Sequence, residues 1–252
     1  RAQPDFNRDL VSNMRLFISG SAPLTEQTFR EFSERTGMAI LERYGMSETL
    51  MNTSNPLKGE RKAGTVGFPL PGISLRIADE RGMELVSGEV GGIELKGPNV
   101  FKGYWEMPDR TAQEFRHDGY FITGDMGVQD EDGRVSIVGR EKDVVISGGL
   151  NVYPAEVETA IGNLPDVADV AVIGAPHPDF GEGVVAVVVS AVGNDVDTST
   201  VREQLKGELA GFKQPQHVET VRELPRNAMG KIQKNSLRDQ FREVFTRTEP
   251  KV

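Results

Sequence analysis

Apolar positions in the first part of the chain follow two different periods. Short apolar runs at residues 16–19 and 39–42 predict buried strands. Between them, two phenylalanines three residues apart mark one face of a helix predicted over residues 25–36, and Gly37 is a typical stop signal. This strand–helix–strand order predicts the end of an α/β layered domain over about residues 1–63.

Short strands and turns replace this pattern from residue 64 to residue 139. Alternating or apolar segments predict strands over residues 74–78, 91–96 and 135–138, and Asp132-Gly133 is a typical hairpin signal. We therefore expect a small β-barrel subdomain, or a twisted antiparallel sheet, over about residues 64–139.

The pattern changes once more after a charged stretch at residues 140–143, where we place the joint between two domains. Pro154 occupies the first turn of a predicted helix that ends at Gly162. Near-continuous β-branched runs over residues 167–173 and 184–189 predict two buried strands. Helix and strands together indicate a second region with its own core.

Two further helices are predicted in this second region. Thr200 with Glu203 fits a capping box at the start of one, and residues 235–246 have the pattern of a final amphipathic helix. This region is typical of a compact α+β domain. The predicted fold is thus α/β plus α+β, with the domains at residues 1–140 and 141–252.

The composition is that of a soluble globular protein. Of 252 residues, 37% are hydrophobic and the mean hydropathy is −0.37, which leaves enough apolar sequence for a core. The 38 acidic residues outnumber the 29 basic residues, which gives a net charge of −9. We therefore expect no nucleic-acid partner and no anionic membrane surface. No apolar run is long enough to predict a membrane span.

Cysteine and histidine usage narrows the chemistry further. The absence of cysteine excludes disulfides, thiol catalysis and cysteine-bound metal, and three scattered histidines argue against a histidine-built metal site. The first residues are polar and lack the apolar region of a signal peptide. From these features we predict a cytoplasmic protein.

Two turns in the first region carry residue types that suit a nucleotide. Gly20-Ser21-Ala22-Pro23 lies between a predicted strand and a predicted helix, where small residues allow a flat ligand to approach, although a plain tight turn is the favoured alternative. Tyr44-Gly45-Met46-Ser47-Glu48 follows a predicted strand and offers an aromatic face, a hydroxyl and a carboxylate for Mg²⁺. A turn with a packed tyrosine and a capping serine explains this second motif equally well.

Later turns carry further candidate motifs. Tyr120-Phe121-Ile122-Thr123-Gly124-Asp125 places a carboxylate just after a predicted strand, where it can bind a ribose diol, although a simple Asp turn is favoured. Gly139-Arg140-Glu141-Lys142-Asp143 is an exposed crossing between domains or a solvated loop. Ser147-Gly148-Gly149 is a hairpin or a passage for a thin ligand. Lys231 lies at the tip of a flexible turn and can reach a phosphate, although most such lysines are only surface residues.

The order and spacing of these motifs resemble the acyl-adenylate-forming enzymes. This superfamily comprises acyl-CoA synthetases, adenylation domains of peptide synthetases and firefly luciferase. The resemblance is to the C-terminal half of such enzymes and covers residues 15–240, with matching segments at residues 44–48, 91–105, 120–125, 139–149 and 225–231. It implies ATP, Mg²⁺ and CoA as cofactors and a small-molecule carboxylic acid as substrate.

The resemblance also implies a role for each matching residue. The implied nucleotide-binding residues are Gly20, Ser21, Ala22, Tyr44, Gly45, Met46, Asp125 and Arg140, the last two at the ribose. The implied catalytic residues are Ser47 at the phosphate, Glu48 as the Mg²⁺ ligand and Lys231 between the acyl carboxylate and the α-phosphate. In the family a mobile C-terminal domain then rotates about a hinge, here Lys142, and brings Ser147, Gly148 and Gly149 to the CoA channel.

Within the superfamily, residues 41–48 and 63–72 are similar to the malonyl-CoA synthetases. Arg43 stands where relatives acting on monocarboxylic acids more often have an uncharged residue. Malonate is therefore the implied substrate, because its second carboxylate needs a charged partner when it is buried. The alternative is that Arg43 pairs with Glu42 or solvates the end of the strand. The choice between malonate and methylmalonate stays open.

One expected family feature, the glycine-rich phosphate loop, is not found in this sequence. We therefore expect a fragment that does not catalyse the full reaction by itself. The alternative functions are a fatty-acid–CoA ligase of another chain length, an adenylation domain for a carrier protein, and a noncatalytic interaction fragment. An acetyltransferase acting on Lys231 is a further possible partner, because acetylation removes the charge of an exposed lysine.

Overall fold

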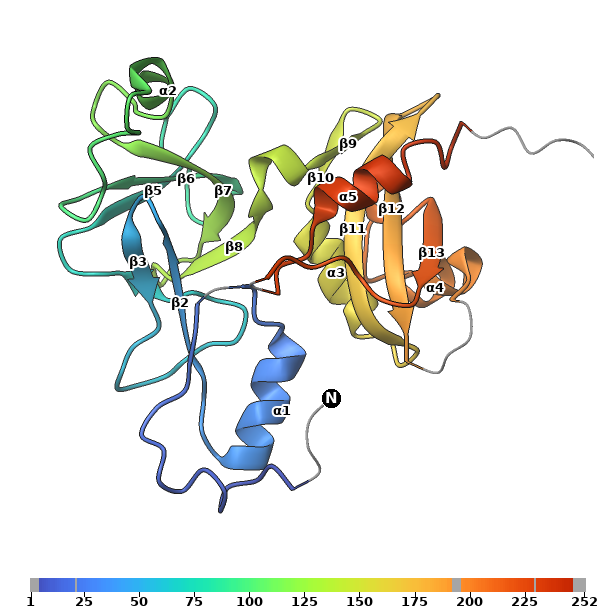
Figure 1. Ribbon diagram of the computed structural model, residues 1–252, viewed down its shortest axis with the longest axis horizontal. Helices are drawn as coiled ribbons and strands as arrows, with labels where there is room; N and C mark the ends of the chain where they lie inside the picture. Colours follow the sequence, from blue (N-terminus) through green and yellow to red (C-terminus); the bar gives the residue numbers. More distant parts are fainter. Residues whose placement is uncertain (1–4, 21, 192–195, 229, 247–252) are drawn as a thin grey trace, which may run out of the picture. The chain divides into compact units, whose positions relative to one another are not determined.

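The computed structural model describes residues 5–20, 22–191, 196–228 and 230–246. The chain divides into two compact units, residues 1–138 and residues 139–252, each with its own hydrophobic core (Figure 1). The boundary between the units lies just before the joint predicted at residues 140–143. Among the helices in the described ranges, none has the length and apolar character needed to cross a bilayer.

The first unit begins with a small mixed sheet. Its four strands, in spatial order, are β1 Ile18–Ser19, β2 Leu41–Met46, β3 Leu50–Ser54 and β4 Phe68–Pro69. Strands β1 and β2 pair in parallel, and helix α1, Glu26–Thr36, connects them. The predicted strand–helix–strand order is therefore confirmed, although β2 begins later than predicted and extends through residues 44–46.

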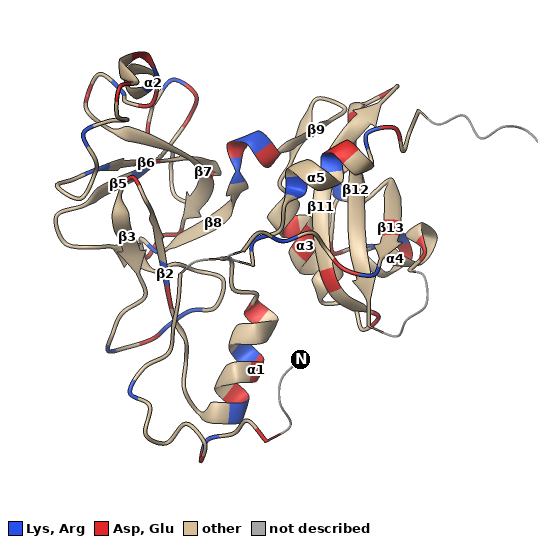
Figure 2. Cartoon of the chain, in the orientation of Figure 1, with Lys and Arg blue, Asp and Glu red and all other residues tan. Residues whose placement is uncertain are grey.

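Helix α1 forms between its predicted start and stop signals. The Thr25 hydroxyl accepts a hydrogen bond from the backbone N–H of Thr28, and Gly37 ends the helix. Phe29 is buried on the inner face. Figure 2 shows charged residues of both signs along α1, which is typical of a helix with one face in solvent.

The rest of the first unit forms an open antiparallel sheet. Its strands, in spatial order, are β5 Ser74–Ala78, β6 Gly91–Lys96, β7 Phe121–Gln129 and β8 Val135–Arg140, and a short helix α2 covers Pro108–Gln113. The antiparallel sheet is thus the alternative that forms. Within the described residues β5 and β8 are its two edges, so the sheet is not closed into a β-barrel, which needs pairing between first and last strands.

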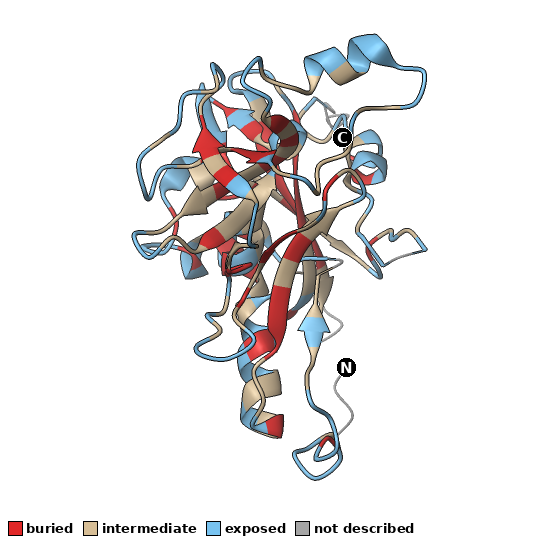
Figure 3. Cartoon of the chain, turned by 90° about the vertical axis from the view of Figure 1, so that its left-hand side faces the viewer, coloured by how far each residue is buried: buried red, intermediate tan, exposed pale blue. Residues whose placement is uncertain are grey.

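Buried side chains from both sheets form the core of the first unit. Tyr44 of β2 packs with residues of the antiparallel sheet, among them Ile77, Ile93 and Val135. Figure 3 shows the buried residues gathered along the strands and the exposed ones mostly in the connecting loops. This packing fixes β2, which carries Tyr44, against the sheet that carries Asp125.

The second unit is an α+β sheet structure. Its elements are β9 Val145–Ser147, β10 Leu150–Val152, α3 Pro154–Gly162, β11 Val167–His177, β12 Gly181–Ser190, α4 Thr198–Gln204, β13 His217–Val221 and α5 Lys234–Gln240. Strand β12 is central: β11 pairs with it antiparallel, β13 pairs with it in parallel, and β9 pairs at its start. Helix α5 lies across β11 and β12 (Figure 1).

Both faces of this sheet are buried, which explains its near-continuous apolar strands. Successive residues of a strand point to opposite faces. Val184 and Val188 therefore join a core with α3 and α4, whereas Val185 and Val187 join a second core with α5. Pro154 begins α3 and Gly162 ends it, as predicted.

Two helix ends differ from the prediction. The N-cap of α4 is Asp197, not Thr200, because the Asp197 carboxylate accepts a hydrogen bond from the backbone N–H of Thr200 at 3.1 Å. The capping-box interpretation of Thr200 with Glu203 is therefore wrong. The final helix is also shorter than predicted, since α5 ends at Gln240 and turns follow it.

Candidate active site

The Tyr44–Glu48 motif and the Tyr120–Asp125 motif meet inside the first unit. The Tyr44 hydroxyl donates a hydrogen bond to Oδ2 of Asp125 at 2.5 Å. Both residues are buried, with exposed fractions of 7% for Tyr44 and 5% for Asp125. A buried carboxylate costs free energy unless donors surround it, so this contact holds Asp125 at a defined place. Residues 81 positions apart in sequence thus share one site.

Asp125 lies inside a strand and not just after one. Strand β7 runs through Phe121–Gln129, with Phe121, Thr123 and Asp125 on its buried face. The backbone N–H of Asp125 donates to the Thr123 hydroxyl at 3.1 Å, and that hydroxyl donates to the carbonyl of Ile93 at 2.7 Å. The interpretation of Asp125 as the first residue of a turn is therefore wrong.

The Tyr44–Glu48 motif spans the end of β2 and the turn into β3. Tyr44, Gly45 and Met46 belong to the strand, and the backbone N–H of Thr49 donates to the carbonyl of Met46 at 3.2 Å. The pairing shifts register between Tyr44 and Gly45, and a Cβ at Gly45 would lie 2.0 Å from the carbonyl oxygen of Leu50. Only glycine fits this bulge.

Glu48 is half-buried and held from the segment that follows β6. The Tyr104 hydroxyl lies 3.2 Å from Oε1 of Glu48 and 3.3 Å from Oε2 of Glu114. The backbone N–H of Phe101 donates to the carbonyl of Glu48 at 2.8 Å. Burial, followed by the charges of Glu114 and Glu48, raises the pKa of Tyr104, which therefore stays a neutral donor.

The residues around Glu48 fit Mg²⁺ only as a partner shared with phosphates. Within the described residues, no group of three or more histidine, aspartate or glutamate side chains could hold a metal ion. Mg²⁺ in nucleotide enzymes commonly uses one or two carboxylates together with phosphate oxygens and water. A single carboxylate such as Glu48 beside the exposed Ser47 meets that requirement.

Strands β2 and β3 carry a cluster of buried polar atoms without partners. Most buried polar atoms in native proteins are hydrogen-bonded. Among the described residues, the exceptions are Oε2 of Glu42, Nε of Arg43, Oγ1 of Thr49, Nδ2 of Asn52, Oγ1 of Thr53 and Oδ1 of Asn99. Each of these atoms can form a hydrogen bond with another molecule or chain segment that reaches it.

Arg43 makes no ion pair with its neighbour. Within the described residues its guanidinium has no hydrogen bond or salt bridge, so the predicted alternative of a Glu42–Arg43 pair is not found. Glu42 is 6% exposed, and burial raises its pKa to about 7, against a smaller opposing effect from the backbone N–H of Leu24. A cation and a partly neutral acid therefore lie side by side in sequence without neutralising each other.

The Gly20–Pro23 turn lies beside this strand. A Cβ at Gly20 would come within 3.3 Å of the carbonyl oxygen of Arg43, so the turn approaches β2 closely. Ala22 is exposed, and Ser21 lies outside the described residues. Gly20 thus lies next to Arg43 of β2, and Ala22 is accessible to solvent.

Sequence reasoning assigned no role to four of the unpartnered residues, Thr49, Asn52, Thr53 and Asn99. Asn52 and Thr53 are fully buried in β3. The Asn99 side-chain amide donates to the carbonyl of Thr49 at 2.7 Å and to Oδ1 of Asn52 at 3.2 Å. The available signal was the polar run after Met51, which is unusual in a buried strand.

The remaining predicted residues lie at the end of β8 or in the second unit. Arg140 ends β8, and Lys142 is exposed in a short 3-10 turn over Glu141–Asp143. Gly148 and Gly149 form the tip of the β9–β10 hairpin with φ of 59° and 79°, as a type I′ turn requires. Ser147 is buried and its hydroxyl lies 3.4 Å from Nε2 of Gln216.

Lys231 is exposed on a hairpin, as predicted. Its backbone N–H donates to Oδ1 of Asn227, and its carbonyl accepts from the backbone N–H of Asn227, both at 2.9 Å. The predicted turn includes Met229, which lies outside the described residues. The backbone of Lys231 is therefore fixed while its side chain extends into solvent.

Comparison with known families agrees with this geometry. The family described as “AMP-binding enzyme” matches residues 1–105, and the family described as “AMP-binding enzyme C-terminal domain” matches residues 156–231. The motif order, the Tyr44–Asp125 site and these matches together make the chain a member of the acyl-adenylate-forming superfamily of AMP-binding enzymes.

Within that superfamily the chain is similar to malonate–CoA ligases. ATP-bound MatB from Rhodopseudomonas palustris has a TM-score of 0.94 and 56% identity, covering 97% of this chain and 49% of that one. The malonate–CoA ligase of Arabidopsis thaliana is 40% identical over 89% of this chain and 38% of its own length. The indoleacetate–CoA ligase of Aromatoleum aromaticum is 40% identical over 94% of this chain and 46% of its own length. The chain spans less than half the length of these relatives.

Proposed function

We propose that this chain supplies the C-terminal part of an AMP-forming acid–CoA ligase whose acid is malonate. The observation that carries the reaction class is the buried hydrogen bond between Tyr44 and Asp125, which joins the motif suited to adenine with the motif suited to ribose. Similarity to ATP-bound MatB supports the same class.

In the first half-reaction the carboxylate of the acid attacks the α-phosphorus of ATP, which yields acyl-adenylate and pyrophosphate. Positioning and charge neutralisation supply most of the catalysis in such a transfer. Gly20, Ala22 and the ring of Tyr44 line the adenine, and Asp125 and Arg140 hold the ribose hydroxyls. Lys231 donates to the acid and the α-phosphate from its exposed hairpin.

Glu48 and Ser47 hold the polyphosphate end of the nucleotide. When bound, Mg²⁺ neutralises charge on the phosphates, and Glu48 is the carboxylate that holds it. The Tyr104 hydroxyl, kept neutral by its raised pKa, orients Glu48. Ser47 is exposed in the turn, and its hydroxyl donates a hydrogen bond to a phosphate oxygen.

In the second half-reaction the CoA thiol attacks the acyl carbon and AMP leaves. The residues 141–252 then act as a mobile domain that turns about Lys142, exchanging the Lys231 hairpin for the Ser147–Gly149 hairpin. The glycine tip suits this task because Gly148 and Gly149 expose backbone without side chains. Nothing lies within 4 Å of a Cβ added at Gly149.

Malonate as the acid rests on Arg43. Its guanidinium has no protein partner among the described residues and lies on the strand that the Gly20 turn approaches. A free guanidinium beside a nucleotide site binds a second carboxylate bidentately. Acids without that carboxylate would leave Arg43 unpaired, and the site would therefore discriminate against them.

Acid-dependent pyrophosphate release in the full-length protein tests this proposal. Malonate, methylmalonate, acetate, octanoate and indoleacetate are compared with wild type, Arg43→Ala and the exposed control Arg81→Ala. Malonate activity lost in Arg43→Ala and kept in Arg81→Ala supports the whole proposal. Preference for a monocarboxylic acid retains the ligase and rejects the role of Arg43. Release with none of the acids favours a noncatalytic fragment.

Separate half-reactions test the two hairpins. Lys231→Ala should lower adenylation strongly and spare thioester formation from supplied acyl-adenylate, whereas Gly149→Leu should do the reverse. Because Gly149 has a positive φ, Gly207→Leu is the matched control, with φ of 84° and equally open surroundings. A loss of both half-reactions in Gly149→Leu that Gly207→Leu reproduces would reject the channel role.

The acceptor and the regulation of Lys231 can be tested with the same protein. Transfer to a carrier protein in place of CoA would identify an adenylation domain. Because Lys231 is exposed, we also propose that an acetyltransferase can modify it, and mass mapping after incubation with such an enzyme tests this. We further propose a cytoplasmic location, on the composition alone; fractionation of cells tests it.

A further inference from the structure

We propose that Arg226 is a positioning residue, which fastens the Lys231 hairpin to the sheet of the second unit through Asp169. Its consequence for catalysis rests on the function proposed above. The role is separate from binding substrate, because Arg226 acts on the backbone beside Lys231.

The hairpin closes through backbone contacts around Lys231. Arg226 and Ile232 form an antiparallel bridge, and the backbone N–H of Gln233 donates to the carbonyl of Pro225 at 2.8 Å. Asn227 accepts from the backbone N–H of Gly230 at 2.9 Å in addition to its two contacts with Lys231. These bonds shape the hairpin, and Ile232 packs against the core that α5 covers. The tip of the hairpin has a further attachment, a polar one.

Arg226 makes that attachment with two nitrogens of one guanidinium. Its Nη1 donates to the carbonyl of Gly230 at 2.6 Å, which is the peptide oxygen next to Lys231. Its Nη2 donates to Oδ2 of Asp169 at 2.6 Å. The planar fork of the guanidinium therefore links the tip of the hairpin with a side chain 57 positions earlier in sequence.

Asp169 is itself fixed to the sheet. It lies near the start of β11, where the pairing with β12 shifts register after Val167. Its Oδ1 accepts a hydrogen bond from the backbone N–H of Val170 at 3.0 Å. A continuous path of contacts therefore runs from β11 through Asp169 and Arg226 to Gly230, whose carbonyl adjoins Lys231.

The proposed reaction requires Lys231 to be positioned accurately, and this path of contacts contributes to that. Lys231 has a long side chain, and its ammonium group has no ion pair among the described residues. A lysine on a loose hairpin would spend little time at the phosphate, and small misplacements cost much of the rate. Fixing the backbone at Gly230 and Lys231 leaves only the side-chain torsions to be ordered.

Amide hydrogen exchange on the 252-residue chain tests the attachment without reference to any activity. We expect Arg226→Ala and Asp169→Ala each to speed exchange of the Lys231 amide by about threefold, because both remove the same link. Arg222→Ala is the matched control, since Arg222 is exposed and has no ion pair among the described residues. Unchanged exchange in both variants would overturn the proposal.

Half-reaction kinetics in the full-length protein then test the catalytic consequence. Each single variant should lower adenylation about tenfold or more, leave thioester formation from supplied acyl-adenylate unchanged, and combine without further loss in the double variant. Asp169 is the decisive position, because a carboxylate cannot bind an anionic phosphate directly. A defect at Arg226 with none at Asp169 would mean that Arg226 contacts substrate, which overturns positioning through Asp169.

The two proposals fail in different ways. Faster exchange in a protein that activates no acid would uphold the attachment and reject the proposed ligase function. Normal adenylation by both variants in an active ligase would reject the catalytic role of the attachment and leave the ligase function intact. Equal loss of both half-reactions would mean a general folding defect and would also overturn the positioning role.

Discussion

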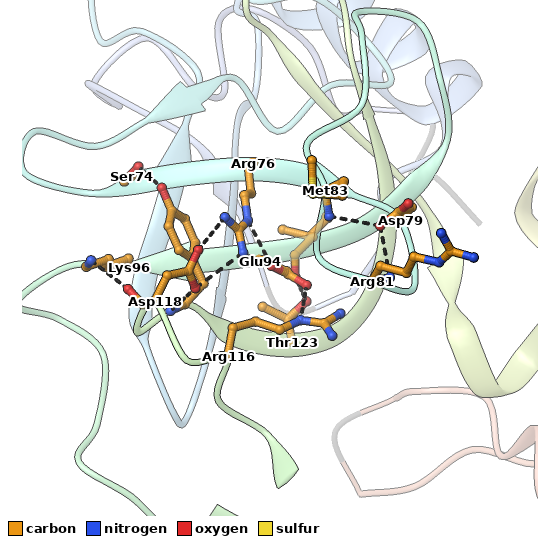
Figure 4. Close-up of polar contacts among 12 residues, drawn as sticks. Ser74, Arg76, Asp79, Arg81, Met83, Glu94, Lys96, Arg116, Asp118 and Thr123 are labelled. Atoms are coloured by element: carbon orange, nitrogen blue, oxygen red, sulfur yellow. Dashed lines mark hydrogen bonds and ion pairs between the residues drawn. The ribbon is translucent and has the colours of Figure 1, made fainter. Parts of the chain in front are cut away.

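Two groups of buried polar residues in the first unit differ in whether their polar atoms have partners. On the antiparallel sheet, Glu94 is only 1% exposed, and its two carboxylate oxygens accept from Arg76 and Arg116 (Figure 4). On β2 and β3, by contrast, Glu42 and Arg43 each retain a buried atom without a partner. The first group is complete within the protein, whereas the second is not.

The Glu94 group is held by many short contacts. Arg76 donates from Nε to Glu94 at 2.9 Å and from Nη1 to Asp118 at 2.7 Å, and its guanidinium lies 3.8 Å from the ring centroid of Tyr120. Arg116 donates to the other oxygen of Glu94 at 2.8 Å. Every charge in this group has an opposite charge beside it, as stable buried ions require.

This difference in hydrogen bonding distinguishes residues that stabilise the fold from residues that can bind a ligand. A satisfied buried network such as that around Glu94 stabilises one arrangement of strands and has no capacity left for a ligand. Unpartnered buried atoms such as those of Glu42 and Arg43 cost free energy in the protein alone, and a ligand or chain segment that bonds to them recovers it. Changes in the first group should therefore alter stability, and changes in the second should alter binding.

The largest expected effect is the loss of stability in Glu94→Ala. Two arginines would lose their shared carboxylate, and one of them, Arg116, would retain only a backbone acceptor among its described contacts. We expect unfolding free energy to fall by about 3 kcal/mol, measured by urea denaturation with circular dichroism. Asp118→Asn is the control, since exposed ion pairs contribute at most about 1 kcal/mol. Equal effects of the two substitutions would contradict the comparison.

A smaller effect, with a defined pH window, is expected at Glu42. Burial raises its pKa to about 7 in the folded chain, from 4.5, so the folded state keeps a proton that the unfolded state releases. Stability should therefore fall as pH rises from about 4.5 to about 7 and then level off. Glu42→Gln cannot ionise, and its stability relative to wild type should rise by about 2 kcal/mol between pH 4.5 and pH 8.

The matched control for this pH dependence is Glu89→Gln, at an exposed glutamate on a turn of the same unit. Its stability relative to wild type should stay level across the same range. If the Glu42→Gln and Glu89→Gln curves run parallel, the raised pKa of the buried Glu42 carboxyl is wrong.

The smallest expected effect on stability, with the most specific effect on binding, is at Arg43. Because Arg43 has no partner among the described residues, Arg43→Ala removes no ion pair and should change unfolding free energy by less than about 1 kcal/mol. Malonate-dependent pyrophosphate release should nevertheless fall by about a hundredfold in the full-length protein. A large loss of stability would place Arg43 with Glu94 as a structural residue.

The fold was predictable where local pattern and final packing agree. Strands β5 and β6 have their predicted bounds because their apolar positions alternate with the pleat. Strand β3 was missed, since Asn52 is a poor strand signal and its polar surroundings in sequence become buried only through tertiary packing. At α4 the sequence pattern indicated a capping box at Thr200, whereas hydrogen bonding in the structure makes Asp197 the N-cap.

For the candidate site the sequence indicated residues but not their contacts. Tyr44, Glu48 and Asp125 followed from motif content and family resemblance. Their partners did not, because the Tyr44–Asp125 bond depends on the packing of two sheets and the Glu48–Tyr104 bond on a long connection. Unpartnered atoms such as Nε of Arg43 have no sequence signature at all, since they are defined by burial.

The position of α5 has a consequence for synthesis of the protein. Its Leu237 and the following Phe241 cover one apolar face of the β11–β12 sheet, and they come after Lys231 in the chain. A nascent chain that has already emerged through Lys231 therefore carries every proposed catalytic group while Ile173 and Val185 still lack their cover. The ribosome therefore completes the proposed site before it completes the core, so truncation just after Lys231 should yield an aggregating polypeptide.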